Sequence, residues 1–143
     1  MIRFVKTILH RVTHQSEPRE TFPALYGADQ AKTAEEELYK FTREKRFDYL
    51  KLLPGALQLI DFLYESGIPI GVVSNKRHEG LGQEIDGLGL TDKIAVYVGA
   101  GQASEDKPSA APLLLALERH GKGLKPADIL YVGDTEADLL CAK

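Results

Sequence analysis

Apolar and polar residues along the chain fall into blocks that predict strands and helices in turn. Short apolar runs at residues 68–73, 94–98 and 129–132 are bounded by turn or capping residues, a pattern typical of buried parallel strands. Helical patterns alternate with these runs at residues 56–65, 77–88 and 110–120. Strands that alternate with helices predict right-handed βαβ crossovers and a parallel sheet.

The N-terminal third of the chain has a mainly helical pattern. Residues 4–12 place Phe4, Ile8 and Val12 at a spacing of four, which favours an amphipathic helix. Residues 15–27 contain prolines and predict a loop with a short helical turn, and residues 31–49 predict a long helix. We therefore expect an α/β fold in which a three-layer, Rossmann-like parallel sheet over residues 54–143 follows a partial helical cap over residues 1–53.

The most informative segment is the strand at residues 129–132 with the Gly-Asp-x-x-x-Asp sequence that follows it. Asp134 and Asp138 would lie on one face of a new helix, just beyond the carboxyl end of a strand, where open α/β sheets bind ligands. Two carboxylates there are suitable ligands for Mg²⁺, which also takes waters and phosphate oxygens. The alternative is that Asp134 caps the helix and Asp138 only answers its dipole.

Two other segments carry candidate phosphate ligands. Ser74 and Asn75 end the strand at residues 68–73, are followed by Lys76, and could donate hydrogen bonds to a phosphoryl group. Ser74 could equally be an ordinary helix cap. Lys107 precedes Pro108, which fits the first position of a helix, and its charge could neutralise phosphate. The alternative for Lys107 is a solvated surface lysine.

The order of these segments resembles the haloacid dehalogenase-like (HAD) hydrolase superfamily, in particular its phosphoglycolate-phosphatase-like members. The resemblance implies Mg²⁺-dependent phosphatase activity that proceeds through an aspartyl-phosphate. It implies catalytic roles for Ser74 and Lys107, substrate binding by Ser74, Asn75 and Lys76, and metal binding by Asp134 and Asp138. The implied partner is a small phosphorylated metabolite.

The family's first motif, Asp-x-Asp-Gly-Thr at the end of the first strand, has no counterpart in this sequence. The first of its aspartates is the nucleophile, yet the first aspartate here is Asp29. In the family that strand lies in the middle of the sheet, between the strands at residues 68–73 and 129–132. We therefore expect the core to lack its first strand and its C-terminal end, and two apolar strand edges to be exposed. Three hypotheses follow: a truncated phosphatase, an inactive remnant that binds phosphate, Mg²⁺ or a partner, and, less consistent with the motif order, a receiver-like signalling domain.

Composition narrows the choice of partners and location. The 143 residues are 43% hydrophobic and 27% charged, which is typical of a globular domain. A formal net charge of −3 gives no basic footprint for nucleic acid, and no apolar run is long enough to span a membrane. The single cysteine excludes an internal disulfide. Because the first residues are interrupted by Lys6 and lack a clean secretory apolar region, we expect a cytoplasmic protein.

Overall fold

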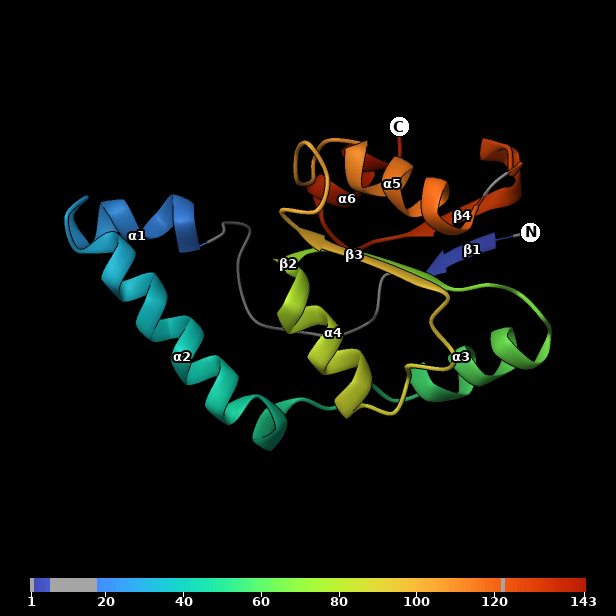
Figure 1. Ribbon diagram of the computed structural model, residues 1–143, viewed down its shortest axis with the longest axis horizontal. Coiled ribbons are helices and arrows are strands. Elements are labelled where there is room, and N and C mark those ends of the chain that lie inside the picture. Colours follow the sequence, from blue (N-terminus) through green and yellow to red (C-terminus); the bar gives the residue numbers. More distant parts are fainter. Residues whose placement is uncertain (1, 6–17, 122) are drawn as a thin grey trace. The chain divides into compact units, whose positions relative to one another are not determined.

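The computed structural model describes residues 2–5, 18–121 and 123–143, which divide into two compact units (Figure 1). The first unit comprises Met1–Leu9 and Leu52–Lys143, and the second comprises His10–Lys51. The described elements of the first unit are β1 (Ile2–Val5), α3 (Ala56–Glu65), β2 (Gly71–Arg77), α4 (His78–Gly87), β3 (Val96–Ala100), α5 (Ala111–His120), a 3₁₀ turn (Pro126–Asp128), β4 (Ile129–Val132) and α6 (Glu136–Cys141). Those of the second unit are α1 (Pro18–Tyr26) and α2 (Ala31–Tyr49).

The strands of the first unit form two parallel pairs. β1 pairs with β4, with Ile2 opposite Ile129 and Val5 opposite Val132, and β2 pairs with β3. These pairs are two separate two-stranded sheets, and contacts between β1 and β2 place them side by side in the order β3-β2-β1-β4. Because all four run in the same direction, their carboxyl ends lie at one edge.

The prediction that the core lacks its first strand is wrong. β1 occupies the central position expected for that strand, between β2 and β4, where it pairs with the edge of β4 and contacts β2. The predicted helix over residues 4–12 is wrong at Phe4 and Val5, which belong to β1, and its remainder lies outside the described residues. Residues 2–5 therefore belong to the α/β unit, whereas the predicted domain boundary assigned them to the cap.

Helices cover both faces of these strands, which confirms the predicted three-layer α/β architecture. Figure 1 shows α3 and α4 on one face and α5 and α6 on the other. Adjacent β2 residues point to opposite faces, so Val72 packs in a cluster with Ile60 of α3 and Leu81 of α4, whereas Val73 packs with Ala116 of α5. Each cluster buries apolar surface that would otherwise destabilise the fold in water.

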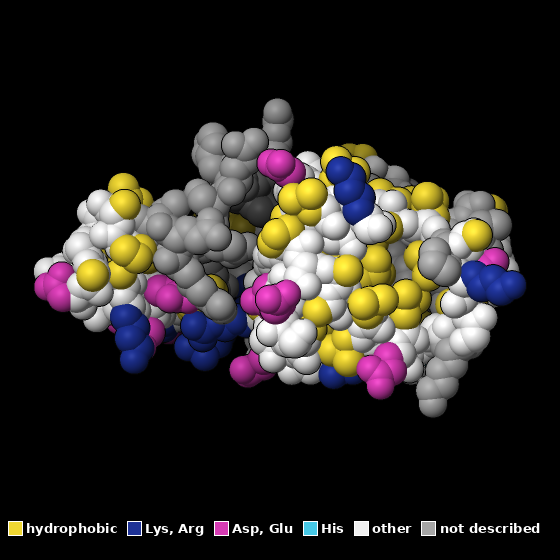
Figure 2. Space-filling model, turned by 90° about the horizontal axis from the view of Figure 1, so that it is seen from above, with side chains coloured by type: hydrophobic (Ala, Val, Ile, Leu, Met, Phe, Trp, Pro, Cys, Tyr) yellow, Lys and Arg dark blue, Asp and Glu magenta, His cyan; other side chains and the backbone are white. Residues whose placement is uncertain are grey.

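Hydrophobic side chains are visible on the α5–α6 side of the first unit (Figure 2). The exposed ones on these two helices are leucines, at 61%, 60% and 44% exposure for Leu114, Leu139 and Leu140. The core of this face therefore lies beneath the helices, and their outer surfaces are not uniformly polar.

The second unit is helical, as predicted, but more so than expected. A helix spans Pro18–Tyr26 and has Pro23 inside it, where a loop with a short turn was predicted. Phe22 and Tyr26 lie one helical turn apart, and their rings meet edge to face with centroids 5.2 Å apart. This contact stabilises the helix. The long helix predicted over residues 31–49 is confirmed. In the part of the chain that the structure describes, no helix combines the length and apolar character needed to cross a membrane.

Candidate functional site

The predicted site residues lie in the carboxyl-terminal part of β2 or in the segments that follow β3 and β4. β2 extends to Arg77, beyond the predicted strand end, but its pairing with β3 shifts between Val73 and Arg77. Irregular pairing of this kind often re-aims side chains beside a site. Ser74 and Asn75 lie within this irregular stretch.

Lys107 is buried beneath this edge. Its ammonium group donates to Asp138 Oδ1 at 2.7 Å and to the carbonyl oxygen of Val73 at 3.4 Å. The two charged side chains are only 4% and 2% exposed, so the alternative of a solvated lysine is wrong. The expected helix start at Pro108 is also wrong, because α5 begins at Ala111 with its proline at position 112.

The carboxylate of Asp138 accepts hydrogen bonds on both oxygens. Oδ1 accepts from Lys107 and from the Tyr131 hydroxyl at 3.0 Å, while Oδ2 accepts from the backbone N–H of Asp134 at 3.3 Å. Oδ2 also accepts from the Thr135 N–H at 3.1 Å and the Thr135 hydroxyl at 2.6 Å. With a side chain 2% exposed, Asp138 is enclosed by protein donors. Its observed role is to join α6, β4 and Lys107.

Thr135, rather than Asp134, caps helix α6. Its side chain accepts from the Asp138 N–H, and the Asp138 side chain accepts from the Thr135 N–H in return, which makes a reciprocal capping box. The alternative in which Asp134 caps the helix is therefore wrong, whereas Asp138 does serve the helix start. This assignment leaves Asp134 in the turn between β4 and the cap.

Asp134 differs from Asp138 in burial, because Asp134 is exposed in the turn after β4 whereas Asp138 is buried. The preceding Gly133 lets the chain turn closely over Asp138, because a Cβ at this glycine would overlap the Asp138 side chain. Among the described residues, no group of three or more His, Cys, Asp or Glu side chains could hold a metal ion. A metal at this edge would therefore rely on Asp134, water and a ligand's own oxygens.

Asn75 and Ser74 make different local contacts. The Asn75 amide donates to the Lys107 carbonyl oxygen at 2.9 Å and accepts from the Lys107 N–H at 3.0 Å. Ser74 Oγ accepts from the Lys76 N–H at 3.2 Å, so its own hydroxyl hydrogen is not used in that bond. Ser74 therefore keeps a donor to direct elsewhere, whereas the Asn75 amide is engaged on both sides.

Lys76 forms an ion pair that its sequence position did not reveal. Its ammonium donates to both carboxylate oxygens of Glu84 on α4, at 2.7 and 2.6 Å. The Glu84 side chain is 4% exposed and that of Lys76 is 43% exposed. The pair holds the end of β2 against α4, and any contact of Lys76 with a substrate would compete with it.

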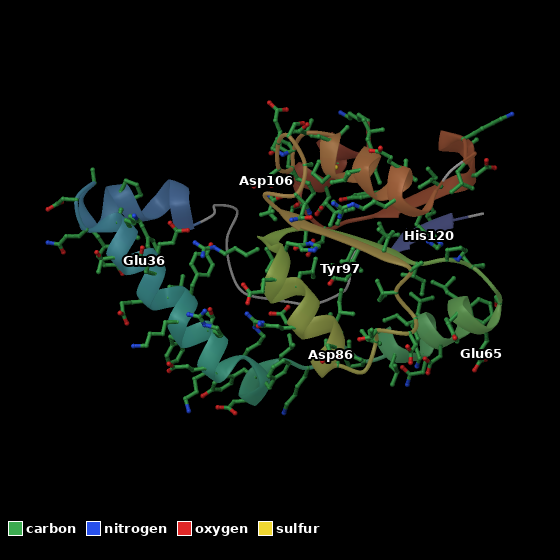
Figure 3. The ribbon with its side chains drawn as sticks, viewed as in Figure 1. Glu36, Glu65, Asp86, Tyr97, Asp106 and His120 are labelled. Carbon is green, nitrogen blue, oxygen red and sulfur yellow. The ribbon has the colours of Figure 1, made fainter. Side chains whose placement is uncertain are left out.

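His78 adds a second tie between the start of α4 and the end of β3. Its Nδ1 accepts from the Gly99 N–H at 3.2 Å, and its ring stacks on Tyr97 with centroids 4.8 Å apart. Figure 3 labels Tyr97 on β3, and its hydroxyl would lie 2.8 Å from a Cβ placed on Gly82 of α4. Burial, followed by the charge of Arg119, lowers the pKa of His78, which keeps the ring neutral and able to accept this bond.

Comparison with known families shows where this arrangement belongs. The family model described as "Haloacid dehalogenase-like hydrolase" matches residues 7–143, most of the chain. The chain belongs to the haloacid dehalogenase-like hydrolases. This result confirms the family resemblance stated from the order of the motifs.

Two curated relatives that the chain matches are named phosphoglycolate phosphatases. The chain is 38% identical over 90 residues to one from Rhodospirillum rubrum, and 32% identical over 92 residues to one from Escherichia coli K12. These matches cover 63% and 64% of this chain and 36% of each relative. The chain thus spans about a third of the length of the curated relatives it matches.

Solved structures of the same superfamily share the fold. A haloacid dehalogenase-like hydrolase from Bacteroides fragilis is similar with a TM-score of 0.76 and 27% identity, over 89% of this chain and 61% of that one. A hydrolase of the superfamily from Ehrlichia chaffeensis gives a TM-score of 0.67 and 22% identity, over 99% and 81% of the two chains. The second likeness, at lower identity, supports the fold alone.

In this haloacid dehalogenase-like fold, the structure joins Lys107 to Asp138 and ties Asn75 to the same lysine. Ser74 lies in the irregular part of β2, and Asp134 lies in the turn that follows β4. The catalytic, substrate-binding and metal-binding roles assigned to these residues stay predictions. Sequence reasoning missed Tyr131 and Glu84; a polar tip on an otherwise apolar strand was the available signal for Tyr131.

Proposed function

We propose that the chain belongs to a Mg²⁺-dependent phosphatase that hydrolyses a small phosphomonoester through an aspartyl-phosphate. In this proposal the 143 residues supply the phosphate-binding and metal-binding groups but not the nucleophile. The observation that carries it is the buried Lys107–Asp138 pair, 2.7 Å apart, beneath the strand edge that bears Ser74 and Asp134. A cation fixed without solvent around it stabilises phosphate charge more strongly than a mobile surface lysine does.

Ser74 and Lys107 would bind the phosphoryl oxygens. The Ser74 hydroxyl accepts from Lys76, so its hydrogen can be donated to a ligand. Lys107 uses two of the three donors of an ammonium group for Asp138 and Val73. Its remaining donor and its charge would stabilise negative charge that grows on the transferring group.

Asp134 is the residue that would hold Mg²⁺. The ion takes one or two carboxylates together with waters and phosphate oxygens, and Asp134 is an exposed residue just beyond the end of β4. When bound, Mg²⁺ would shield the charge of the phosphate. Haloacid dehalogenase-like phosphatases are in general metal-dependent, which agrees with this assignment. Asp138 would act indirectly, because its oxygens already accept bonds from Lys107, Tyr131 and the cap.

The covalent step lacks its carboxylate in this chain. The family places the nucleophile at the end of the first strand, yet Lys6 follows β1 and no acid precedes Glu17 in the sequence. Charge stabilisation cannot replace the group that forms the phosphoryl bond. We therefore expect the 143-residue chain to bind phosphate without turning over a phosphomonoester.

A second candidate is a catalytically inactive family member that binds phosphate or Mg²⁺, or acts as an interaction partner. One observation favours it: β1 already fills the central position, beside both β2 and β4. A strand carrying Asp-x-Asp would have to displace β1 to reach the place where the family has its nucleophile.

Substitution of Lys6 and Ile8 separates these two candidates. The double variant Lys6→Asp/Ile8→Asp creates Asp-x-Asp directly after β1, and hydrolysis of p-nitrophenyl phosphate is measured with and without Mg²⁺. We expect no turnover by the unmodified chain, Mg²⁺-dependent turnover by the variant, and its loss when Asp134→Asn is added. A folded variant that binds inorganic phosphate but stays inactive supports the second candidate. Robust turnover by the unmodified chain that requires Asp134 would refute the missing-nucleophile proposal.

The substrate class is a small phosphorylated metabolite, and phosphoglycolate is the member that the names of the curated relatives favour. A net charge of −3 gives no support to nucleic acid as the ligand. The cytoplasmic location stays a prediction from the first residues of the sequence.

A further inference from the structure

Asn75 connects two segments of the site that are far apart in the sequence. Its amide donates to the Lys107 carbonyl oxygen at 2.9 Å and accepts from the Lys107 N–H at 3.0 Å. Both bonds are partly buried and span 32 residues of sequence. The end of β2 is thereby joined to the loop that carries the lysine.

The chemistry of this tie is specific to a carboxamide. The main chain of Lys107 presents one donor and one acceptor, and a single planar carboxamide can hydrogen-bond to both. A carboxylate could accept only from the N–H, and its second oxygen would face the carbonyl oxygen of Lys107 without a hydrogen between them. A side chain without polar atoms would leave two partly buried backbone groups unpaired, at a cost for each.

The tie also fixes where the Lys107 side chain begins. The far end of that side chain is held by Asp138 and by the Val73 carbonyl oxygen, so the lysine is restrained at its backbone and at its ammonium group. Within the same loop, Asp106 accepts from the N–H groups of Gly101 and Ser109, which gives the loop its own internal turn (Figure 3). Asn75 connects this turn to the part of β2 that also carries Ser74.

We infer that Asn75 is a positioning residue, which sets Lys107 beside Ser74 and does not itself contact phosphate. This inference rests on the proposed function, in which Lys107 is a phosphate ligand. It replaces the substrate-binding role predicted for Asn75, because the donor–acceptor edge of the amide is committed to the Lys107 backbone and only its second N–H is left over. The Ser74 hydroxyl and the Lys107 ammonium group then supply the donors to phosphate, and Asn75 determines their separation.

The test uses the ¹⁵N-labelled 143-residue chain and two observations on each variant. Hydrogen exchange reports on the Lys107 backbone amide, and a titration with inorganic phosphate reports the dissociation constant. In Asn75→Ala we expect Lys107 amide exchange to be at least about tenfold faster and phosphate binding to be about tenfold weaker, since one hydrogen bond lost can change an equilibrium by that factor. Asn75→Asp keeps an acceptor for the Lys107 N–H but sets an oxygen against the Lys107 carbonyl, so it should slow the exchange only in part relative to Asn75→Ala. Ile60→Val, in the core cluster with Val72, is a control for general destabilisation and should leave the Lys107 amide and the phosphate titration unchanged.

Each result has a separate meaning. Weaker phosphate binding with a Lys107 amide that stays protected in Asn75→Ala would overturn the inference in favour of direct contact. Faster exchange with unchanged phosphate affinity would overturn it as well, because the tie would then be merely structural. Failure of the unmodified chain to bind phosphate would refute the proposed function, while the exchange of the Lys107 amide would still report on the tie. If Asn75→Ala does not fold, Asn75→Ser, which retains one polar group, is measured in its place and should give an intermediate exchange rate.

Discussion

Two lysine–carboxylate pairs lie near the carboxyl ends of the strands, and they differ chiefly in burial. Lys107 and Asp138 are both enclosed, with side chains 4% and 2% exposed, whereas Lys76 is 43% exposed and only its partner Glu84 is buried. A buried ion has no water to replace a lost partner, so breaking such a pair is costly. A half-exposed ammonium group can return to solvent when its partner is removed. The N–O distances are nearly equal, 2.7 and 2.6 Å, so distance alone does not show which ion pair contributes more to stability.

The largest expected effect comes from breaking the buried pair on one side. Asp138→Asn should lower the free energy of unfolding by about 3–5 kcal/mol, because it leaves the Lys107 charge buried without a counter-charge. Adding Lys107→Met should recover part of this loss, since it removes the orphaned charge. Urea denaturation of the two variants measures both values. A double variant that is no more stable than Asp138→Asn would show that the charge of Lys107 is not what makes the loss large.

A smaller loss is expected from the half-exposed pair. Glu84→Gln keeps the shape of the side chain and should lower the free energy of unfolding by about 1–2 kcal/mol, as Lys76 regains water. The same urea denaturation checks it, with Gln83→Ala on the exposed side of α4 as the matched control. If Glu84→Gln costs as much as Asp138→Asn, burial of both partners is not the deciding factor.

The Tyr131 hydroxyl, which donates to the buried Asp138, should make the free energy of unfolding sensitive to alkaline pH. Burial and the nearby Asp138 charge raise the pKa of Tyr131, whose hydroxyl donates to Asp138. Because the unfolded state loses this proton first, the stability that it contributes is complete below about pH 10 and declines as the pH rises above that value. Tyr131→Phe should cost about 1 kcal/mol at pH 7 and make the alkaline decline shallower. Unfolding curves at pH 7 to 11 test this, and an unaltered alkaline slope in Tyr131→Phe would count against it.

His78, at the start of the helix that carries Glu84, should make the free energy of unfolding sensitive to acid. This is the smallest effect that we expect. The pKa of His78 is lowered, so the unfolded state binds a proton first and stability falls as the pH drops below about 6.5. His78→Gln should make that acid dependence shallower by replacing the titrating acceptor of the Gly99 N–H. The exposed His120, replaced in the same way, is the control. Equal effects of the two substitutions between pH 7 and 5 would contradict the assignment.

The elements that the sequence could predict are those set by local apolar periodicity. The strand at residues 129–132, and the helices over residues 56–65 and 110–120, follow from local apolar periodicity and were predicted closely. β1 was missed because its few residues fit a helical spacing as well as a strand. Its identity depends on pairing with β4, which lies more than a hundred residues later in the chain.

Within the site, residue types were predictable but their partners were not. Lys107 and the Gly-Asp-x-x-x-Asp segment could be singled out because their spacing resembles a family pattern. That Asp138 faces inward and Asp134 outward depends on Gly133 and on the cap at Thr135, which only the folded turn reveals. The contacts of Asn75 and Lys76 likewise depend on a loop and a helix that tertiary structure brings to them.

The central claim is that the chain retains a phosphate site with one exposed metal ligand, Asp134. Titration of the unmodified chain with inorganic phosphate, with and without Mg²⁺ and beside the Asp134→Asn variant, tests it most directly. We predict that phosphate binds the unmodified chain, that Mg²⁺ strengthens this binding, and that Asp134→Asn removes the Mg²⁺ effect while leaving the chain folded. Absence of phosphate binding in the folded chain, or an Mg²⁺ effect that persists undiminished in Asp134→Asn, would contradict the claim.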